Sequence, residues 1–271
     1  MNQFRELRRS APDRKPEPAV RPKASPGNAE EAQRTARRAF MAVASAGLAG
    51  LALAPGIRLV QIATANEPTQ ASASVRWGML VDANRCKTDC DACVKACNTE
   101  NGLSGGTAPT DVQWIRTIKI HDKRHDRTIN APVMCQHCAD PPCVDVCPTG
   151  ASFKRADGIV LVDRHSCIGC RYCMMACPYK ARSFVHEPVH DQRADVPRGK
   201  GCVEGCTMCV HRIDRGASPA CVEACPEGVF TFGNLNDPDS AIAQRLRSVA
   251  SSQIRADLKL DTGVRYEGIG T

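Results

Sequence analysis

The spacing of its cysteines most constrains what this chain can fold into. The chain has 271 residues and 17 cysteines, an odd number that disulfides cannot pair completely. It is also too long for a small scaffold stapled by disulfides. Sixteen of the cysteines form four groups of four. Group one is Cys86, Cys90, Cys93 and Cys97; group two is Cys135, Cys138, Cys143 and Cys147; group three is Cys167, Cys170, Cys173 and Cys177; group four is Cys206, Cys209, Cys221 and Cys225.

Group three has the spacing of a bacterial ferredoxin, C-x2-C-x2-C-x3-C-P. Three thiolates two residues apart lie on a loop that can wrap a cubane and bind three of its irons. The fourth, Cys177, comes further on, and in two-cluster ferredoxins this cysteine binds the neighbouring cluster. Pro178 follows it, and its fixed φ suits the first turn of a helix, so we expect a helix to begin there. The spacing predicts a 4Fe-4S cluster with a second one beside it.

The same crossing rule, applied to all four groups, predicts four 4Fe-4S clusters in two pairs. Groups two and three form one pair, and groups one and four form the other. The predicted ligands are Cys86, Cys90, Cys93 and Cys225 for cluster 1; Cys135, Cys138, Cys143 and Cys177 for cluster 2; Cys167, Cys170, Cys173 and Cys147 for cluster 3; and Cys206, Cys209, Cys221 and Cys97 for cluster 4.

Zinc is the main alternative, because C-x2-C is also half of a zinc ribbon. A tetrahedral zinc site takes two cysteine pairs from separate loops, whereas group three has three close cysteines and a Cys-Pro within one short segment. Zinc therefore remains an alternative mainly for group four. Covalent haem is excluded, since no C-x-x-C is followed directly by histidine; after Cys209 comes Val210. The seventeenth cysteine, Cys202, is either a substitute ligand or, as we expect, a spare thiol.

Three other side chains inside the ligand loops are also possible ligands. We expect the Met174-Met175 pair to pack against cluster sulfur instead, and His137 to act as a hydrogen-bond donor within its loop. The sequence contains no P-loop, no dinucleotide-binding glycine motif and no recognisable nucleophile triad. We therefore predict no catalytic residue.

The net charge of +7 does not indicate a nucleic-acid surface. Residues 1–41 hold ten Lys/Arg and five Asp/Glu, which leaves 26 Lys/Arg against 24 Asp/Glu in the rest of the chain. Thiolate-bound clusters would make this nearly neutral body acidic. We therefore expect no nucleic-acid partner.

The N-terminus resembles a twin-arginine export signal. Residues 1–41 read as a disordered basic region, and Arg37, Arg38 and Phe40 stand before a short apolar stretch of small residues. That stretch is too short to span a bilayer. Residues 42–65 then form the apolar region and cleavage site, with cleavage expected after Ala65 or, alternatively, Ala73. The alternative is an amphipathic start to the first helix. Such signals export proteins already folded around their cofactors, which implies a periplasmic location at the cytoplasmic membrane.

Short β-rich segments lie beside the groups and predict an α+β fold of duplicated two-cluster ferredoxin modules over residues 76–233. Asp157-Gly158 separates two of these segments and favours a hairpin turn. A C-terminal extension, residues 234–271, contains a helical stretch over residues 240–250 that we expect to dock on the body or a partner. The expected strands are 77–81, 113–120, 151–153, 159–162 and 229–232.

Residues 76–233 resemble the four-cluster ferredoxin-type subunits of membrane oxidoreductases, such as the polysulfide, tetrathionate, dimethyl sulfoxide and formate enzymes. The resemblance depends on residues 134–143, 167–173 and 219–226. Together with the signal, residues 86–90 and 179–184 look most like the DsrO-type subunits of the Dsr membrane complex, which is associated with dissimilatory sulfite reduction.

The resemblance implies an electron-transfer subunit without a substrate site of its own. It further implies three kinds of partner: an integral membrane subunit that interacts with quinone, a multihaem cytochrome c and other iron–sulfur subunits. An alternative to a role in sulfite metabolism is electron transfer within a polysulfide, tetrathionate or nitrite reductase complex or within a hydrogenase complex. A self-sufficient reductase and a zinc-binding module are further alternatives.

Overall fold

The computed structural model describes residues 71–269 except 107, 124–125 and 191. The predicted signal residues Arg37, Arg38 and Phe40, the cleavage site at Ala65 and the disordered region 1–41 lie outside the described residues. In the part that is described, no helix is both long and apolar enough to cross a membrane.

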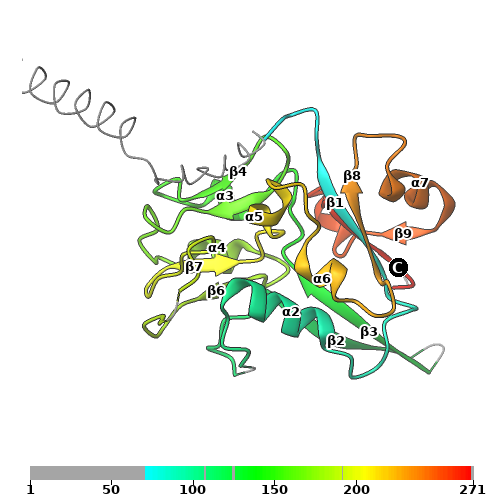
Figure 1. The fold of residues 1–271 in the computed structure, drawn as a ribbon, viewed down its shortest axis with the longest axis horizontal. Coiled ribbons are helices and arrows are strands. Elements are labelled where there is room, and N and C mark those ends of the chain that lie inside the picture. The colour runs from blue at the N-terminus through cyan, green and yellow to red at the C-terminus, as the bar shows by residue number, and fades with distance from the viewer. Residues whose placement is uncertain (1–70, 107, 124–125, 191, 270–271) are drawn as a thin grey trace, which may run out of the picture. The chain divides into compact units, whose positions relative to one another are not determined.

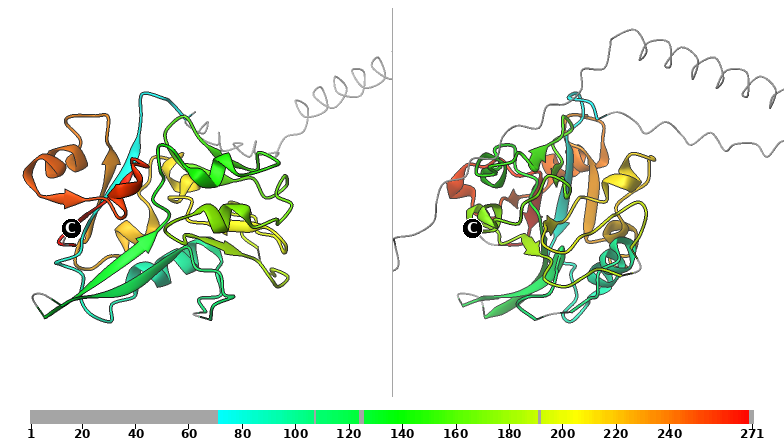
Figure 2. Two further views of the ribbon diagram at one scale, coloured as in Figure 1. Left: turned by 180° about the vertical axis from the view of Figure 1, so that it is seen from behind. Right: turned by 90° about the vertical axis from the view of Figure 1, so that its left-hand side faces the viewer.

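A four-stranded sheet joins the two ends of the described chain. Its order is β8-β1-β10-β9, with strands β1 (Trp77–Asp82), β8 (Phe230–Asn234), β9 (Ser251–Ser252) and β10 (Val264–Glu267). Strand β1 pairs antiparallel with β8 and parallel with β10. Its residues Met79, Leu80 and Val81 are all buried, as expected for a strand covered on both faces. The sheet with α7 lies to one side in Figure 1, and the view from behind in Figure 2 shows the same arrangement.

Three antiparallel hairpins carry the chain between the cysteine groups. They are β2 (Ile115–Asp122) with β3 (Arg127–Met134), β4 (Ser152–Lys154) with β5 (Val160–Val162), and β6 (Arg182–Phe184) with β7 (Val203–Gly205). The predicted turn at Asp157-Gly158 lies between β4 and β5, and Gly158 has a φ of 85°, which favours glycine. Strands β3, β6, β7, β9 and β10 are absent from the sequence-based prediction.

The helices are short, and most of them lie within or beside a ligand group. They are α2 (Ala92–Asn101), α3 (Pro142–Asp145), α4 (Tyr172–Ala176), α5 (Val210–Ile213), α6 (Ala220–Glu223) and α7 (Ala241–Ser248), with a 3-10 helix at Ala256–Leu258.

The expectation that a helix begins at Pro178 is wrong. Helix α4 precedes the Cys-Pro pair and ends at Ala176, and Cys177 has the extended angles φ −73° and ψ 111°. A residue before proline is pushed out of the helical region by the proline ring. Helices α3 and α6 likewise end before Cys147-Pro148 and Cys225-Pro226. The proline therefore stops each helix and leaves the fourth cysteine on extended chain.

The described part of the C-terminal extension, residues 234–269, packs on the body. Ser240 caps α7 by accepting a hydrogen bond from the Ala243 amide at 3.2 Å, and Ile242 is fully buried. Arg245 of α7 pairs with Asp82 of β1 at 3.2 Å and with Glu267 of β10 at 3.0 Å. The segment thus supplies strands β9 and β10 of the sheet, together with helix α7.

A buried ion pair stabilises the loop before group four. The Glu204 side chain on β7 is 0% exposed, and Arg198 Nε lies 3.0 and 3.1 Å from its two oxygens. Arg198 also donates to the Gly102 carbonyl at 2.6 Å, at the end of α2. This pair connects β7 to α2.

We expect Glu204→Gln to lower the free energy of unfolding by about 3–5 kcal/mol, because it leaves a buried guanidinium without its counter-charge. Guanidinium denaturation of the anaerobic protein, followed by its visible absorbance, measures the change. The matched control is Asp257→Asn, which removes an exposed pair with Arg255 and is expected to cost less than about 1 kcal/mol. Equal denaturation midpoints for the two variants would contradict the prediction.

Candidate iron–sulfur centres

Three of the four predicted ligand sets line a cavity of their own. Each of these cavities takes three cysteines from one group and the fourth from the paired group. We call them cavities 1, 2 and 4, after the predicted clusters. The assignment of a cluster to each cavity stays a prediction.

Cavity 2 is lined by Cys135, Cys138 and Cys143 together with Cys177. The loop 135–143 and the end of α4 supply these side chains. The Ala181 amide donates to Cys177 Sγ at 3.5 Å. Cys177 therefore lies with group two, although it belongs to group three in sequence.

Cavity 1 is lined by Cys86, Cys90 and Cys93 together with Cys225. Asn130 on β3 donates to Cys86 Sγ at 3.4 Å, and the Val229 amide donates to Cys225 Sγ at 3.4 Å. The three-residue spacing between Cys86 and Cys90 does not prevent these residues from lining one cavity.

Cavity 4 is lined by Cys206, Cys209 and Cys221 together with Cys97 of α2. Asn101 Nδ2 lies 3.5 Å from Cys97 Sγ, and the Met208 amide donates to Cys206 Sγ at 3.4 Å.

The four cysteines predicted to bind cluster 3 are more exposed to solvent than the other three ligand sets. Cys173 is buried, Cys167 and Cys147 are half-buried, and Cys170 is exposed. Cys167 and Cys173 pack in one apolar group with Cys143, and the Ser152 amide donates to Cys147 Sγ at 3.3 Å. Cluster 3 is thus the predicted cluster nearest to solvent.

The donor sets of the three cavities fit a cubane cluster. Burial raises the pKa of the Cys93, Cys97 and Cys138 thiols to about 12. Such thiols stay protonated unless a positive metal centre takes the place of the proton. Among the described residues, no three His, Cys, Asp or Glu side chains come close enough to bind one metal ion. In a cubane each thiolate binds a different iron, so its four sulfurs need not converge on one point.

A buried arginine beside cavity 2 was missed in the sequence. Arg182 Nη2 donates to Cys143 Sγ at 3.2 Å, and its Nη1 lies 3.3 Å from Ser152 Oγ. Burial alone would lower the pKa of Arg182, but the neighbouring Cys143 and Cys135 sulfurs outweigh it and raise that pKa. The guanidinium therefore places a positive charge beside the sulfurs. In the sequence, Arg182 follows Cys177-Pro178 closely, and this nearness to a ligand was the signal that could have revealed it.

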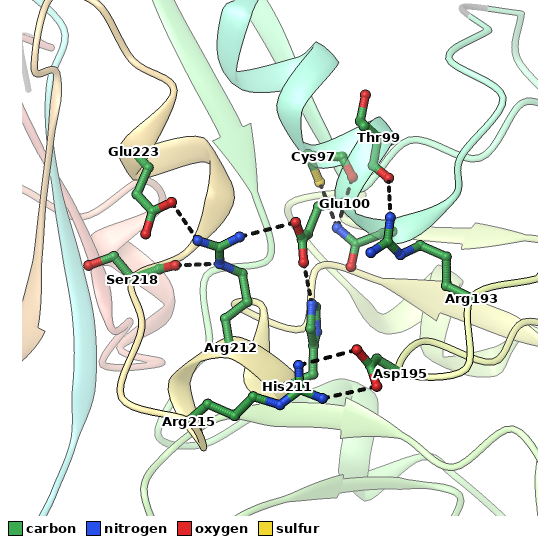
Figure 3. A network of polar contacts seen from close by, with 11 residues as sticks. Cys97, Thr99, Glu100, Arg193, Asp195, His211, Arg212, Arg215, Ser218 and Glu223 are labelled. Carbon is green, nitrogen blue, oxygen red and sulfur yellow. Dashed lines mark hydrogen bonds and ion pairs between the residues drawn. The ribbon is translucent and has the colours of Figure 1, made fainter. Parts of the chain in front are cut away.

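A polar network holds groups one and four together (Figure 3). Glu100 of α2 contacts His211 Nε2 at 2.8 Å and Arg212 Nη1 at 3.1 Å, both on α5. Arg212 also pairs with Glu223 of α6 and donates to the Ser218 carbonyl. Burial alone would raise the pKa of Glu100, but the His211 hydrogen bond and the Arg212 charge lower it. The network keeps α2, with Cys97, beside the helices that follow Cys209 and contain Cys221.

Cys202, the two methionines and His137, which the sequence suggested as possible ligands, differ in their surroundings. Cys202 donates to the Arg164 carbonyl at 3.3 Å and does not line cavity 1, 2 or 4. Met174 packs against the Cys143–Cys173 apolar group, as expected, but Met175 is 76% exposed, so that half of the expectation is wrong. His137 Nδ1 accepts a hydrogen bond from the Val160 amide at 3.1 Å, so this nitrogen is not a donor, and a donor role of the other ring nitrogen stays a prediction.

Comparison with known proteins identifies the family. Residues 127–235 match the 4Fe-4S dicluster domain. The chain is 41% identical over 266 residues to the Hdr-like menaquinol oxidoreductase iron-sulfur subunit 1 of Archaeoglobus fulgidus, covering 86% of this chain and 98% of that protein.

Two further relatives match a smaller share of the chain. A tetrathionate reductase subunit of Salmonella typhimurium is 40% identical over 199 residues, covering 72% of this chain and 74% of that protein. Protein NrfC of Escherichia coli is 43% identical over 178 residues, covering 64% and 72%. The chain therefore belongs to the iron–sulfur electron-transfer subunits of membrane-associated oxidoreductase complexes, and it binds multiple 4Fe-4S clusters.

Proposed function

We propose that the chain relays electrons through four 4Fe-4S clusters, held by the four cysteine sets predicted from the sequence. The observation that carries the proposal is the crossed arrangement of the cavities, in which Cys177, Cys225 and Cys97 each join the three cysteines of another group. Such crossing is typical of two-cluster ferredoxins.

In this function the chain's own residues hold and tune the clusters. Bound 4Fe-4S clusters supply one-electron chemistry, and their potentials depend on hydrogen bonds to sulfur, charge and solvent exposure. The thiolates fix the clusters, the apolar walls exclude water, and donors such as Asn130 and Arg182 point N–H groups at sulfur.

The redox partners in this proposal are a quinone-interacting membrane subunit and a multihaem cytochrome c or another iron–sulfur subunit. The kinship to a menaquinol oxidoreductase subunit supports the quinone side. The kinship to subunits of tetrathionate reductase and sulfite dehydrogenase supports a role in sulfur metabolism, for which the Dsr complex is our first candidate.

The location in this proposal is periplasmic, after export by the twin-arginine route. The support is the Arg37-Arg38 pair with Phe40 before an apolar stretch, and the proposed cleavage follows Ala65 or, alternatively, Ala73. Replacing both arginines with lysine is the direct test, with the protein then expected to accumulate in the cytoplasm with its clusters.

The experiment that tests the relay uses the complex purified anaerobically from the native host. Four clusters require about sixteen irons and as many acid-labile sulfides per chain. Quinol added to the intact complex should reduce the clusters, and quinol added to the separated chain should not. Reduction of the isolated chain at the same rate would contradict a relay that depends on a membrane subunit.

An exposed apolar patch next to cluster 3 is the proposed contact for the membrane subunit. The patch consists of Ile168, Tyr172 and Met175, which are 67%, 57% and 76% exposed, around the exposed Cys170. Permanent subunit contacts are more apolar than transient electron-transfer encounters. The patch therefore fits a stable integral partner better than a diffusing cytochrome.

We expect the double variant Ile168→Glu, Met175→Glu to weaken association with the membrane subunit by about tenfold or more, because charges then replace the apolar centre of the contact. Co-purification and quinol-driven cluster reduction measure the loss. The control is Leu258→Glu, which changes another exposed apolar residue that is not part of the patch. A double variant that stays bound and is reduced like the control would contradict the assignment.

A further inference from the structure

Two side chains in the wall of cavity 4 each carry a ring nitrogen with no hydrogen-bond partner among the described residues. Trp114 and His137 both line the cavity beside the four cysteines, and they are only 1% and 2% exposed. The unpartnered nitrogens are Trp114 Nε1 and His137 Nε2, and Asn101 Oδ1 in the same wall is an unpartnered oxygen. Leaving a buried polar nitrogen unpaired is unfavourable, so two in one cavity call for an acceptor.

Trp114 Nε1 can only donate, because an indole nitrogen carries a proton and no lone pair for bonding. The residue stands directly before β2, and its N–H makes no hydrogen bond with Asn101 Oδ1, the unpartnered oxygen of the same wall. The wall is otherwise mainly apolar and includes Met79, Ile115 and Val264. The cysteine sulfurs line the cavity as well, and they are the acceptors that a cluster site offers.

His137 is also set up as a donor at its free nitrogen. Because the Val160 amide donates to Nδ1 at 3.1 Å, Nδ1 must carry a lone pair, which leaves the proton of the neutral ring on Nε2. The backbone of His137 is held at a φ of 43°, and its carbonyl accepts from the Gly263 amide at 3.2 Å. Left-handed backbone angles are unfavourable for histidine, and here hydrogen bonds to the ring and to the carbonyl hold the residue in place. Proteins retain such a conformation mainly where function needs it.

We propose that Trp114 Nε1–H and His137 Nε2–H donate hydrogen bonds to sulfur atoms of the cluster held by Cys97, Cys206, Cys209 and Cys221, and thereby raise its reduction potential. The inference rests on the proposed four-cluster function. Sulfur gains negative charge when a cluster is reduced, so each N–H···S bond stabilises the reduced state more than the oxidised state. The two bonds add to those from Asn101 and the Met208 amide.

Trp114→Phe is the first variant, because phenylalanine keeps an aromatic ring in the wall and removes only the donor. The matched control is Trp77→Phe, since Trp77 stacks on Phe232 at 5.1 Å and does not line cavity 4. Potentiometric titration followed by electron paramagnetic resonance measures each cluster. We expect Trp114→Phe to shift one component about tenfold toward the oxidised state, about 59 mV for one electron, with Trp77→Phe unchanged. His137→Gln is expected to shift the same component in the same direction.

A spectroscopic measurement tests the bond itself. The chain has two tryptophans, so protein labelled with ¹⁵N-tryptophan should show a nitrogen coupling to the reduced cluster that Trp114→Phe abolishes and Trp77→Phe keeps. Cys206→Ala identifies the component of cavity 4, and if it removes no component, the four-cluster proposal fails and this inference with it. If Cys206→Ala removes a component whose potential and nitrogen coupling Trp114→Phe leaves unchanged, the four-cluster proposal stands and the hydrogen bonds do not exist.

Discussion

Complete removal of iron is expected to abolish the compact fold of the chain. Cavities 1, 2 and 4 lie inside the body, and their walls include cysteines from distant parts of the sequence. Outside these contacts the regular structure is slight: α3, α5 and α6 have four residues each, and β4 to β7 have three. Helices and hairpins this short are not stable alone. Metal binding and folding are therefore one process here.

Limited proteolysis and far-ultraviolet circular dichroism measure this loss before and after anaerobic treatment with a chelator. The treated chain should be digested completely, with no resistant fragment from the region 76–233. Restoring iron and sulfide under reducing conditions should recover the resistant core, which controls for damage by the chelator. A compact, protease-resistant chain without iron would contradict the prediction.

Local patterns allowed much of the site to be predicted from the sequence. The cysteine spacing grouped the ligands because each loop must present three sulfurs to one cubane. The hairpin at Asp157-Gly158 followed from turn chemistry, and β1 and β8 followed from short apolar runs. These features depend on neighbouring residues alone.

Long-range contacts were beyond the sequence. No local signal indicates that β10 inserts beside β1, a pairing between Met79 and Val264 across most of the chain. The partners of Arg182 and His137 are likewise set by tertiary packing. The role of Pro178 was misjudged because a proline can begin a helix or stop one, and only the backbone of Cys177 decides between the two.

Cys177→Ala is expected to remove cluster 2 and leave cluster 3 in place. In sequence Cys177 follows Cys173 closely, so a simple reading would assign it to cluster 3. In the structure it lines cavity 2 with Cys135, Cys138 and Cys143. Losing one of four clusters removes about a quarter of the iron and acid-labile sulfide. The spectrum should therefore lose the same component as in Cys138→Ala and keep the component that Cys170→Ala removes.

The matched control is Cys202→Ala, because Cys202 is the one cysteine outside the four groups. Its thiol donates to a backbone carbonyl, and its loss should leave the iron content at the wild-type value. If Cys177→Ala instead matches Cys170→Ala in the component that it loses, the crossing is absent in this pair. The assignments of Cys97 and Cys225 would then lose their basis too, since the same crossing places them in cavities 4 and 1.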